Sequence, residues 1–125
     1  MMYLNKPVQY LTDSDVDSSG NLINEDIPTD QPVLIMLQAG FCGHCTVAKP
    51  DFQKFADANE GKVFCATVQA DGKEPGEKEL AKKLGGTLPD FYGYPHYAVY
   101  KDGKFLKNHE SGRKFEDLDN CMKSL

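Results

Sequence analysis

Five short apolar runs along the chain have the length and composition of β-strands. Residues 33–37 (V-L-I-M-L) form a continuous run without alternation, which is typical of a strand buried on both faces of a mainly parallel sheet. Residues 8–11 and 63–68 predict two further strands. Residues 96–100 and 105–107 flank the turn sequence K-D-G-K, so they predict an antiparallel hairpin.

Three other segments have the periodicity of helices. The apolar positions of the first are Val47, Ala48, Phe52, Phe55 and Ala56. Pro50 should kink this helix, because proline removes one backbone hydrogen bond, and Gly61 should end it. Residues 74–84 predict a surface helix that stops at the two glycines 85–86. The apolar positions of the last helix are Phe115, Leu118, Cys121, Met122 and Leu125.

The order of these elements is βαβα followed by ββα, with an irregular connector at residues 18–32. The first half predicts parallel strands joined by crossover helices, and the hairpin adds antiparallel strands. A chain of 125 residues suits one domain of ordinary size. We therefore predict an α/β fold and a single domain that spans residues 1–125.

The net charge of the chain lies in its first quarter. Residues 1–30 contain six acidic residues and Lys6, which account for the whole charge of −5. No Lys- or Arg-rich stretch could neutralise phosphates, so we expect no nucleic-acid partner. No apolar run approaches the roughly 20 residues of a membrane span, and the first residues lack the apolar block of a secretory signal. We therefore expect a cytoplasmic, monomeric protein with no membrane partner.

The candidate chemistry lies in the sequence C-G-H-C from Cys42 to Cys45. It follows a predicted buried strand and begins a predicted helix, whose free N–H groups and positive dipole end favour a thiolate over a thiol. The spacing lets the two sulfurs form a reversible disulfide, and the thiolate is the form that attacks disulfides. We predict that Cys42 is the thiol that attacks a substrate disulfide. Cys45, one turn into the helix, is the thiol that resolves the resulting mixed disulfide.

The same spacing is also half of a zinc site, but a structural zinc needs two further ligands. Cys65 and Cys121 stand singly, and His96 and His109 are too far apart in sequence to form a second ligand pair. We therefore expect no metal and no organic cofactor. Cys65 and Cys121 are interpreted as core residues, since a buried free cysteine behaves as a small hydrophobic side chain.

Five motifs occur in an order that is familiar from one family. They are Q-Y-L-T-D at 9–13, F-C-G-H-C at 41–45, Pro50, G-Y-P at 93–95 ahead of a strand and K-D-G, and Gly112-Arg113 before the last helix. In these motifs the chain resembles the thioredoxin-fold proteins, and its C-G-H-C centre is similar to that of protein disulfide isomerase domains. The resemblance covers nearly the whole chain. It implies a central mixed β-sheet flanked by helices on both faces.

The resemblance also implies roles for single residues. Cys42 would form a mixed disulfide with a protein substrate, and Cys45 would resolve it. Pro95 would be cis and face the dithiol, with the backbone of Tyr94 pairing with an extended substrate; the alternative is an ordinary trans proline. His44, which follows Gly43, would favour the Cys42 thiolate and make the pair more oxidising; the alternative is a solvated side chain without effect.

Arg113 has two interpretations of equal weight. In isomerase domains the arginine can approach the resolving cysteine and ease its deprotonation, and the alternative is a solvated charge at the start of a helix. Of the aromatic residues before and within the hairpin, only Tyr94 and Tyr92 are expected at the substrate surface. The others are interpreted as core residues: Phe91, Tyr97 and Tyr100.

The chain departs from the family pattern at three positions. The buried Asp or Glu six residues before the first cysteine is Met36 here, the usual Trp is Phe41, and the residue after the proline is His96. Without that carboxylate, deprotonation of Cys45 should be slower. We hypothesise that His96 or Arg113 partly replaces the missing acid.

The resemblance implies thiol–disulfide exchange on protein substrates, with a redox partner that recycles the pair. A different interpretation is a non-catalytic module that binds client peptides along the Tyr94-Pro95 edge, and Met36 is its best support. The C-G-H-C centre favours oxidation or isomerisation, whereas the missing secretory signal favours a reducing compartment. The direction of exchange therefore stays open at this point.

Overall fold

A five-stranded mixed sheet forms the centre of the computed structural model, which describes residues 3–125. Its strands are β1 (Gln9–Tyr10), β2 (Val33–Gln38), β3 (Phe64–Gln69), β4 (His96–Lys101) and β5 (Lys104–His109). They lie in the order β1-β3-β2-β4-β5. Strands β1 and β2 run parallel to β3, and β4 is antiparallel to both β2 and β5. The expected mixture of parallel strands and an antiparallel hairpin is confirmed.

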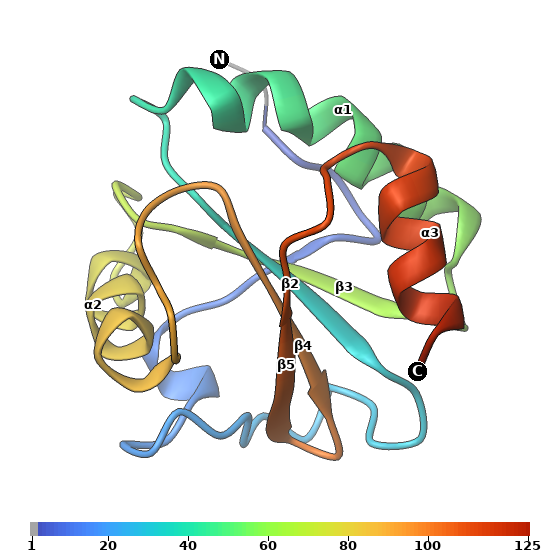
Figure 1. Cartoon of the computed structure of the whole chain (residues 1–125). Coiled ribbons are helices and arrows are strands. Elements are labelled where there is room, and N and C mark those ends of the chain that lie inside the picture. Colours follow the sequence, from blue (N-terminus) through green and yellow to red (C-terminus); the bar gives the residue numbers. More distant parts are fainter. Residues whose placement is uncertain (1–2) are drawn as a thin grey trace.

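Helices cover both faces of this sheet (Figure 1). The helices α1 (Gly43–Ala58) and α3 (Phe115–Lys123) lie together on one face. The helix α2 (Glu77–Thr87) and the short 3₁₀-helix η1 (Asp13–Asp15) lie on the other. The prediction of a central mixed sheet with helices on both faces is therefore correct.

The two cores follow from the alternation of side chains along β2. Leu34 and Met36 pack on the α1 face with the buried Phe52 and with Leu118 of α3. Their neighbours in sequence point the other way and pack with α2; these are Val33, Ile35 and Leu37. Because both faces of the strand are buried, its sequence is a continuous apolar run rather than an alternating one.

Three predictions about the helices were wrong. The second helix begins at Glu77 and continues through both glycines to Thr87, instead of spanning 74–84. Each glycine costs the helix about 1 kcal/mol, and burial of Leu80 and Leu84 against the sheet offsets that cost. Val47 is 78% exposed and does not join the apolar face of α1, and Leu125 is 49% exposed and lies beyond the end of α3.

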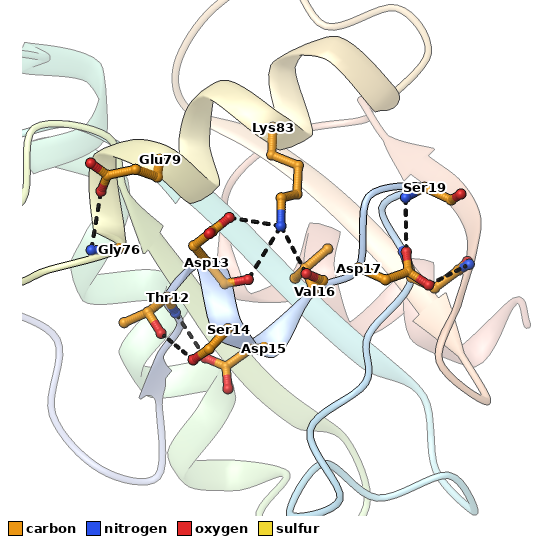
Figure 2. A network of polar contacts seen from close by, with 11 residues as sticks. Thr12, Asp13, Ser14, Asp15, Val16, Asp17, Ser19, Gly76, Glu79 and Lys83 are labelled. Atoms are coloured by element: carbon orange, nitrogen blue, oxygen red, sulfur yellow. Dashed lines mark hydrogen bonds and ion pairs between the residues drawn. The ribbon is translucent and has the colours of Figure 1, made fainter.

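Lys83 of α2 ties η1 to the rest of the fold (Figure 2). Its Nζ lies 2.7 Å from Asp13 Oδ1 and donates to the carbonyl oxygens of Asp13 at 3.3 Å and of Val16 at 2.9 Å. The acidic first quarter, which the sequence indicated only as a solvated face, is thereby fixed to α2. Asp13 N–H also donates to the carbonyl of Gly76, next to the start of the same helix.

Candidate active site

The start of α1 holds the two cysteines of the C-G-H-C sequence. Cys42 is the N-cap of the helix, and its Sγ accepts a hydrogen bond from the Cys45 backbone N–H at 3.1 Å. The Cys42 thiol also donates to the carbonyl oxygen of Tyr94 at 3.5 Å. Cys42 is partly exposed, whereas Cys45 is 0% exposed. The expected arrangement of an accessible first thiol and a buried second thiol is present.

Burial makes the second thiol hard to deprotonate. Removal from solvent, together with the hydrogen bond to Cys42, raises the pKa of Cys45 to about 12. The positive charge of Lys49 acts in the opposite direction and lowers that pKa. Cys45 therefore needs help from a neighbouring group before it can act as a thiolate at neutral pH.

A layer of buried polar side chains lies between α1 and the sheet. It consists of Lys49 from α1 together with Gln38, Thr67 and Gln69 from the strands, all of which are at most 4% exposed. Gln38 Nε2 donates to Thr67 Oγ1 at 3.2 Å and to Gln69 Oε1 at 2.8 Å. Thr67 Oγ1 in turn donates to the carbonyl of Met36 at 2.7 Å. Hydrogen bonds of this kind let polar groups remain buried at modest cost.

Asp71 connects this layer to the loop that precedes Cys42. Both of its carboxylate oxygens accept from the Gly40 N–H, at 2.9 and 3.0 Å, and Oδ1 also accepts from Gln69 Nε2 at 2.6 Å. Burial alone would raise the pKa of Asp71, but the bonds from Gly40 and Gln69 outweigh it and hold the pKa below its usual value. Asp71 is therefore a carboxylate at neutral pH.

The loop before β4 faces the dithiol. The Tyr94-Pro95 peptide bond is cis, as the resemblance implied. The Tyr94 ring makes edge contacts with Phe41 at 6.5 Å and with Phe91 at 5.4 Å between ring centroids. Tyr92 is 87% exposed, as expected, whereas Tyr94 and Phe91 are both partly buried and pack against the core of the α2 face. Tyr97 and Tyr100 are buried, as expected.

A cleft of about 650 Å³ lies between this loop, the first turns of α1 and the segment before α3. Its lining includes His44, Val47, Tyr92, Pro95 and Arg113. Val47 and Tyr92, together with the neighbouring Phe41, expose apolar surface around the cysteines. Several charged side chains also line the cleft, so it combines apolar with polar surface, as ligand-binding sites do.

The structure places the other predicted residues as follows. Gly43 is the first residue of α1 and has open space where a side chain would lie, so no close contact requires glycine there. His44 is exposed beside the cleft. Arg113 is also exposed, and its charge acts on the buried phenol of Tyr97. Cys65 and Cys121 are 2% and 8% exposed, which confirms the prediction that they lie in the core.

The residue that follows the cis proline is held by the hairpin. His96 is buried, its Nε2 lies 2.8 Å from Asn108 Oδ1, and its ring packs against Phe91. Asn108 Nδ2 donates to the carbonyl of Pro89, so the pair fixes the loop that carries Tyr94. The hypothesis that His96 or Arg113 replaces the family's acid stays a prediction.

The described residues provide neither a metal centre nor a membrane-spanning helix. Within residues 3–125, the His, Cys, Asp and Glu side chains form no group of three that could hold a metal ion. None of the helices described in the structure has the length and apolar content needed to span a membrane.

Comparison with known families decides which family this arrangement belongs to. The sequence profile of the family Thioredoxin matches residues 17–124, which include both cysteines and the Tyr94-Pro95 bond. The chain belongs to the thioredoxin family. It is 43% identical to the thioredoxin-like protein 453L of Invertebrate iridescent virus 6, over 96% of this chain and 95% of that protein.

Protein disulfide isomerases are also similar to this thioredoxin-family chain. It is 30% identical to the protein disulfide-isomerase C1F5.02 of Schizosaccharomyces pombe over 81% of its own length, but it spans only 19% of that protein. The solution structure of the first thioredoxin domain of mouse protein disulfide-isomerase A4 superposes with a TM-score of 0.68 at 21% identity, covering 98% of this chain and 77% of that one. The fold is thus the thioredoxin fold, and the chain is a thioredoxin-like thiol–disulfide oxidoreductase domain with a C-x-x-C pair.

Lys49 and Asp71 were not among the residues predicted from the sequence. Lys49 follows Cys45 by four residues and precedes Phe52 by three, so helical periodicity places it on the buried face of α1. That signal was available, although lysine is rarely buried. Asp71 follows a predicted strand, and nothing in its sequence surroundings indicated a bond to Gly40.

Proposed function

We propose that this domain exchanges disulfides with protein substrates through a mixed disulfide on Cys42, which Cys45 then resolves. The observation that carries the proposal is the position of the two thiols at the start of α1. Cys42 Sγ is accessible and accepts the Cys45 N–H at 3.1 Å, while Cys45 lies buried directly behind it. An N–H donor at a helix start stabilises a thiolate, which is the attacking form.

The exchange proceeds in two steps. The Cys42 thiolate attacks one sulfur of a substrate disulfide, a bond from Cys42 to that sulfur forms, and the other substrate sulfur leaves as a thiolate. Cys45, once deprotonated, attacks Cys42 Sγ, the Cys42–Cys45 disulfide forms, and the first substrate sulfur leaves with the bonding electrons. The substrate disulfide is reduced by two electrons and the protein pair is oxidised. Oxidation of a substrate dithiol is the reverse sequence.

Features around the cysteines support a protein substrate. The cleft of about 650 Å³ and the exposed Phe41, Val47 and Tyr92 suit an extended peptide with apolar side chains. The Tyr94 carbonyl, 3.5 Å from Cys42 Sγ, is placed to pair with the backbone next to a substrate cysteine. A redox partner would recycle the pair after each turnover.

A trapping experiment tests the two roles. Cys45→Ser should accumulate a covalent complex between Cys42 and a test protein that contains a disulfide, whereas Cys42→Ser should form none and lose all turnover. Cys65→Ala serves as the matched control, since Cys65 is buried in the core away from the cleft and its loss should leave exchange unchanged. A Cys42→Ser protein that keeps a bound client, with a wild type that shows no turnover, would establish the non-catalytic binding module instead.

The reduction potential of the pair decides the direction. It is measured by equilibration with glutathione in a protein that lacks Cys65 and Cys121. A potential below about −250 mV would indicate a reductase, and one above about −200 mV an oxidase or isomerase. Absence of a reversible two-electron couple would contradict exchange altogether.

A further inference from the structure

Lys49 is a buried basic side chain on α1, close in the helix to the two cysteines. It is 0% exposed and lies one helical turn after Cys45 on the same face of α1. The groups that act on it electrostatically include the thiols of Cys45 and Cys42 and the carboxylate of Asp71. The charge of Cys45 also acts on the phenols of Tyr94, in the loop before β4, and of Tyr97, in β4.

Burying a lysine is costly, so its position needs a reason. Burial lowers the pKa of Lys49, and the charges of Cys45, Asp71 and Cys42 only partly oppose this. The neutral amine, which can accept a proton, is therefore populated at a lower pH than in an exposed lysine.

The other groups on the face of the sheet that α1 covers are poor proton acceptors. The position six residues before Cys42 is Met36, which is 0% exposed and packs in the apolar core of the α1 face. The amides of Gln38 and Gln69 and the hydroxyl of Thr67 do not take a thiol proton at neutral pH. Asp71 is a carboxylate held by two hydrogen-bond donors, Gly40 and Gln69, which makes it a weak base.

We propose that the Nζ of Lys49 accepts the proton of the Cys45 thiol when the mixed disulfide is resolved. The inference rests on the proposed function, because it assigns a role within its second step. Cys45–SH and the Lys49 amine become a thiolate and an ammonium, and the thiolate attacks Cys42 Sγ. The bond between Cys42 and the substrate sulfur breaks, the substrate leaves as a thiolate, and the proton on Lys49 passes to that thiolate. The amine is restored and charge is conserved.

The two steps can be timed separately with 5,5′-dithiobis(2-nitrobenzoate). Attack by Cys42 releases one coloured thiolate, and attack by Cys45 on the resulting mixed disulfide releases a second. Lys49→Met should leave the first phase within about twofold and slow the second by roughly a hundredfold at neutral pH, the size of a typical acid–base contribution. The deficit should shrink towards pH 10, where hydroxide replaces the lost acceptor.

Two further variants separate this role from charge and from structure. Lys54→Met removes the same charge from an exposed position of α1 and should change neither phase. Lys49→Arg keeps a cation that cannot be deprotonated, so the second phase should be as slow as in Lys49→Met. Restoration of the rate by arginine, or an unchanged second phase in a folded Lys49→Met protein, would overturn the proposal.

Failure of the proposed function has a different signature. In that case the wild type would release no second thiolate at any pH, whatever residue stands at position 49. If circular dichroism shows that Lys49→Met is not folded, the pH dependence of the second-phase rate in Lys49→Arg gives the same test. A second phase that keeps the wild-type pH profile in Lys49→Arg would then refute proton acceptance.

Discussion

Removal of the Asp71 side chain should destabilise the domain through the loop that carries Cys42. The carboxylate accepts from two donors, the Gly40 N–H and the Gln69 amide, at 2.6–3.0 Å. A hydrogen bond to a charged group contributes about 1.5–3 kcal/mol, and the partial exposure of Asp71 lets water replace some of each bond. We therefore expect Asp71→Ala to lower the free energy of unfolding by about 2 kcal/mol, and Asp71→Asn, which keeps one acceptor oxygen, by about 1 kcal/mol.

The pH dependence of this loss has a definite sign. The folded protein holds the pKa of Asp71 below the ordinary value of 3.8, because the bonds from Gly40 and Gln69 outweigh burial. The contribution of the carboxylate is thus complete above pH 3.8 and is lost as the pH falls through the folded value. The stability difference between wild type and Asp71→Asn should be constant down to about pH 4 and should shrink below it.

Urea unfolding followed by far-UV circular dichroism measures these differences, since the chain contains no tryptophan for fluorescence. Asp30→Ala is the matched control, because Asp30 is exposed in the connector before β2 and its loss should have little effect. An Asp71→Ala protein within about 0.5 kcal/mol of wild type would refute the reasoning, as would a difference that persists at low pH.

Two further predictions concern stability away from the dithiol. Lys83→Met removes the ion pair and hydrogen bonds to η1 that Figure 2 shows. It should lower the free energy of unfolding by about 1 kcal/mol, which is measured as a lower midpoint of thermal unfolding. Lys82→Met, at the exposed neighbouring position, should leave that midpoint unchanged. Burial raises the pKa of Cys65 from 9.0 to about 12, so the folded state keeps a proton that the unfolded state loses in that range. Stability should fall by up to about 1.4 kcal/mol per pH unit above pH 9 from this thiol, and Cys65→Ala should show a shallower alkaline decline; equal slopes in urea titrations would contradict it.

Local sequence patterns sufficed where a structural feature depends on neighbouring residues. The hairpin follows from Asp102-Gly103, whose φ angles of 52° and 77° fit the positive values that a tight hairpin turn needs. The position of Cys42 follows from a buried strand, a glycine-containing break and a helix start. The second helix did not follow in this way, because burial of Leu80 and Leu84 overrode the stop signal of two glycines.

By itself the sequence determined the order of strands and helices, the two-sided burial of β2 and the place of the cysteine pair at a helix start. These features depend on periodicity and backbone chemistry, which act over a few residues. Only the tertiary structure decided that Lys49 is buried behind Cys45 and that Asp71 holds Gly40, 31 residues away. The physical reason is that a polar group can be buried only where partners from other elements meet it, and those partners are distant in sequence.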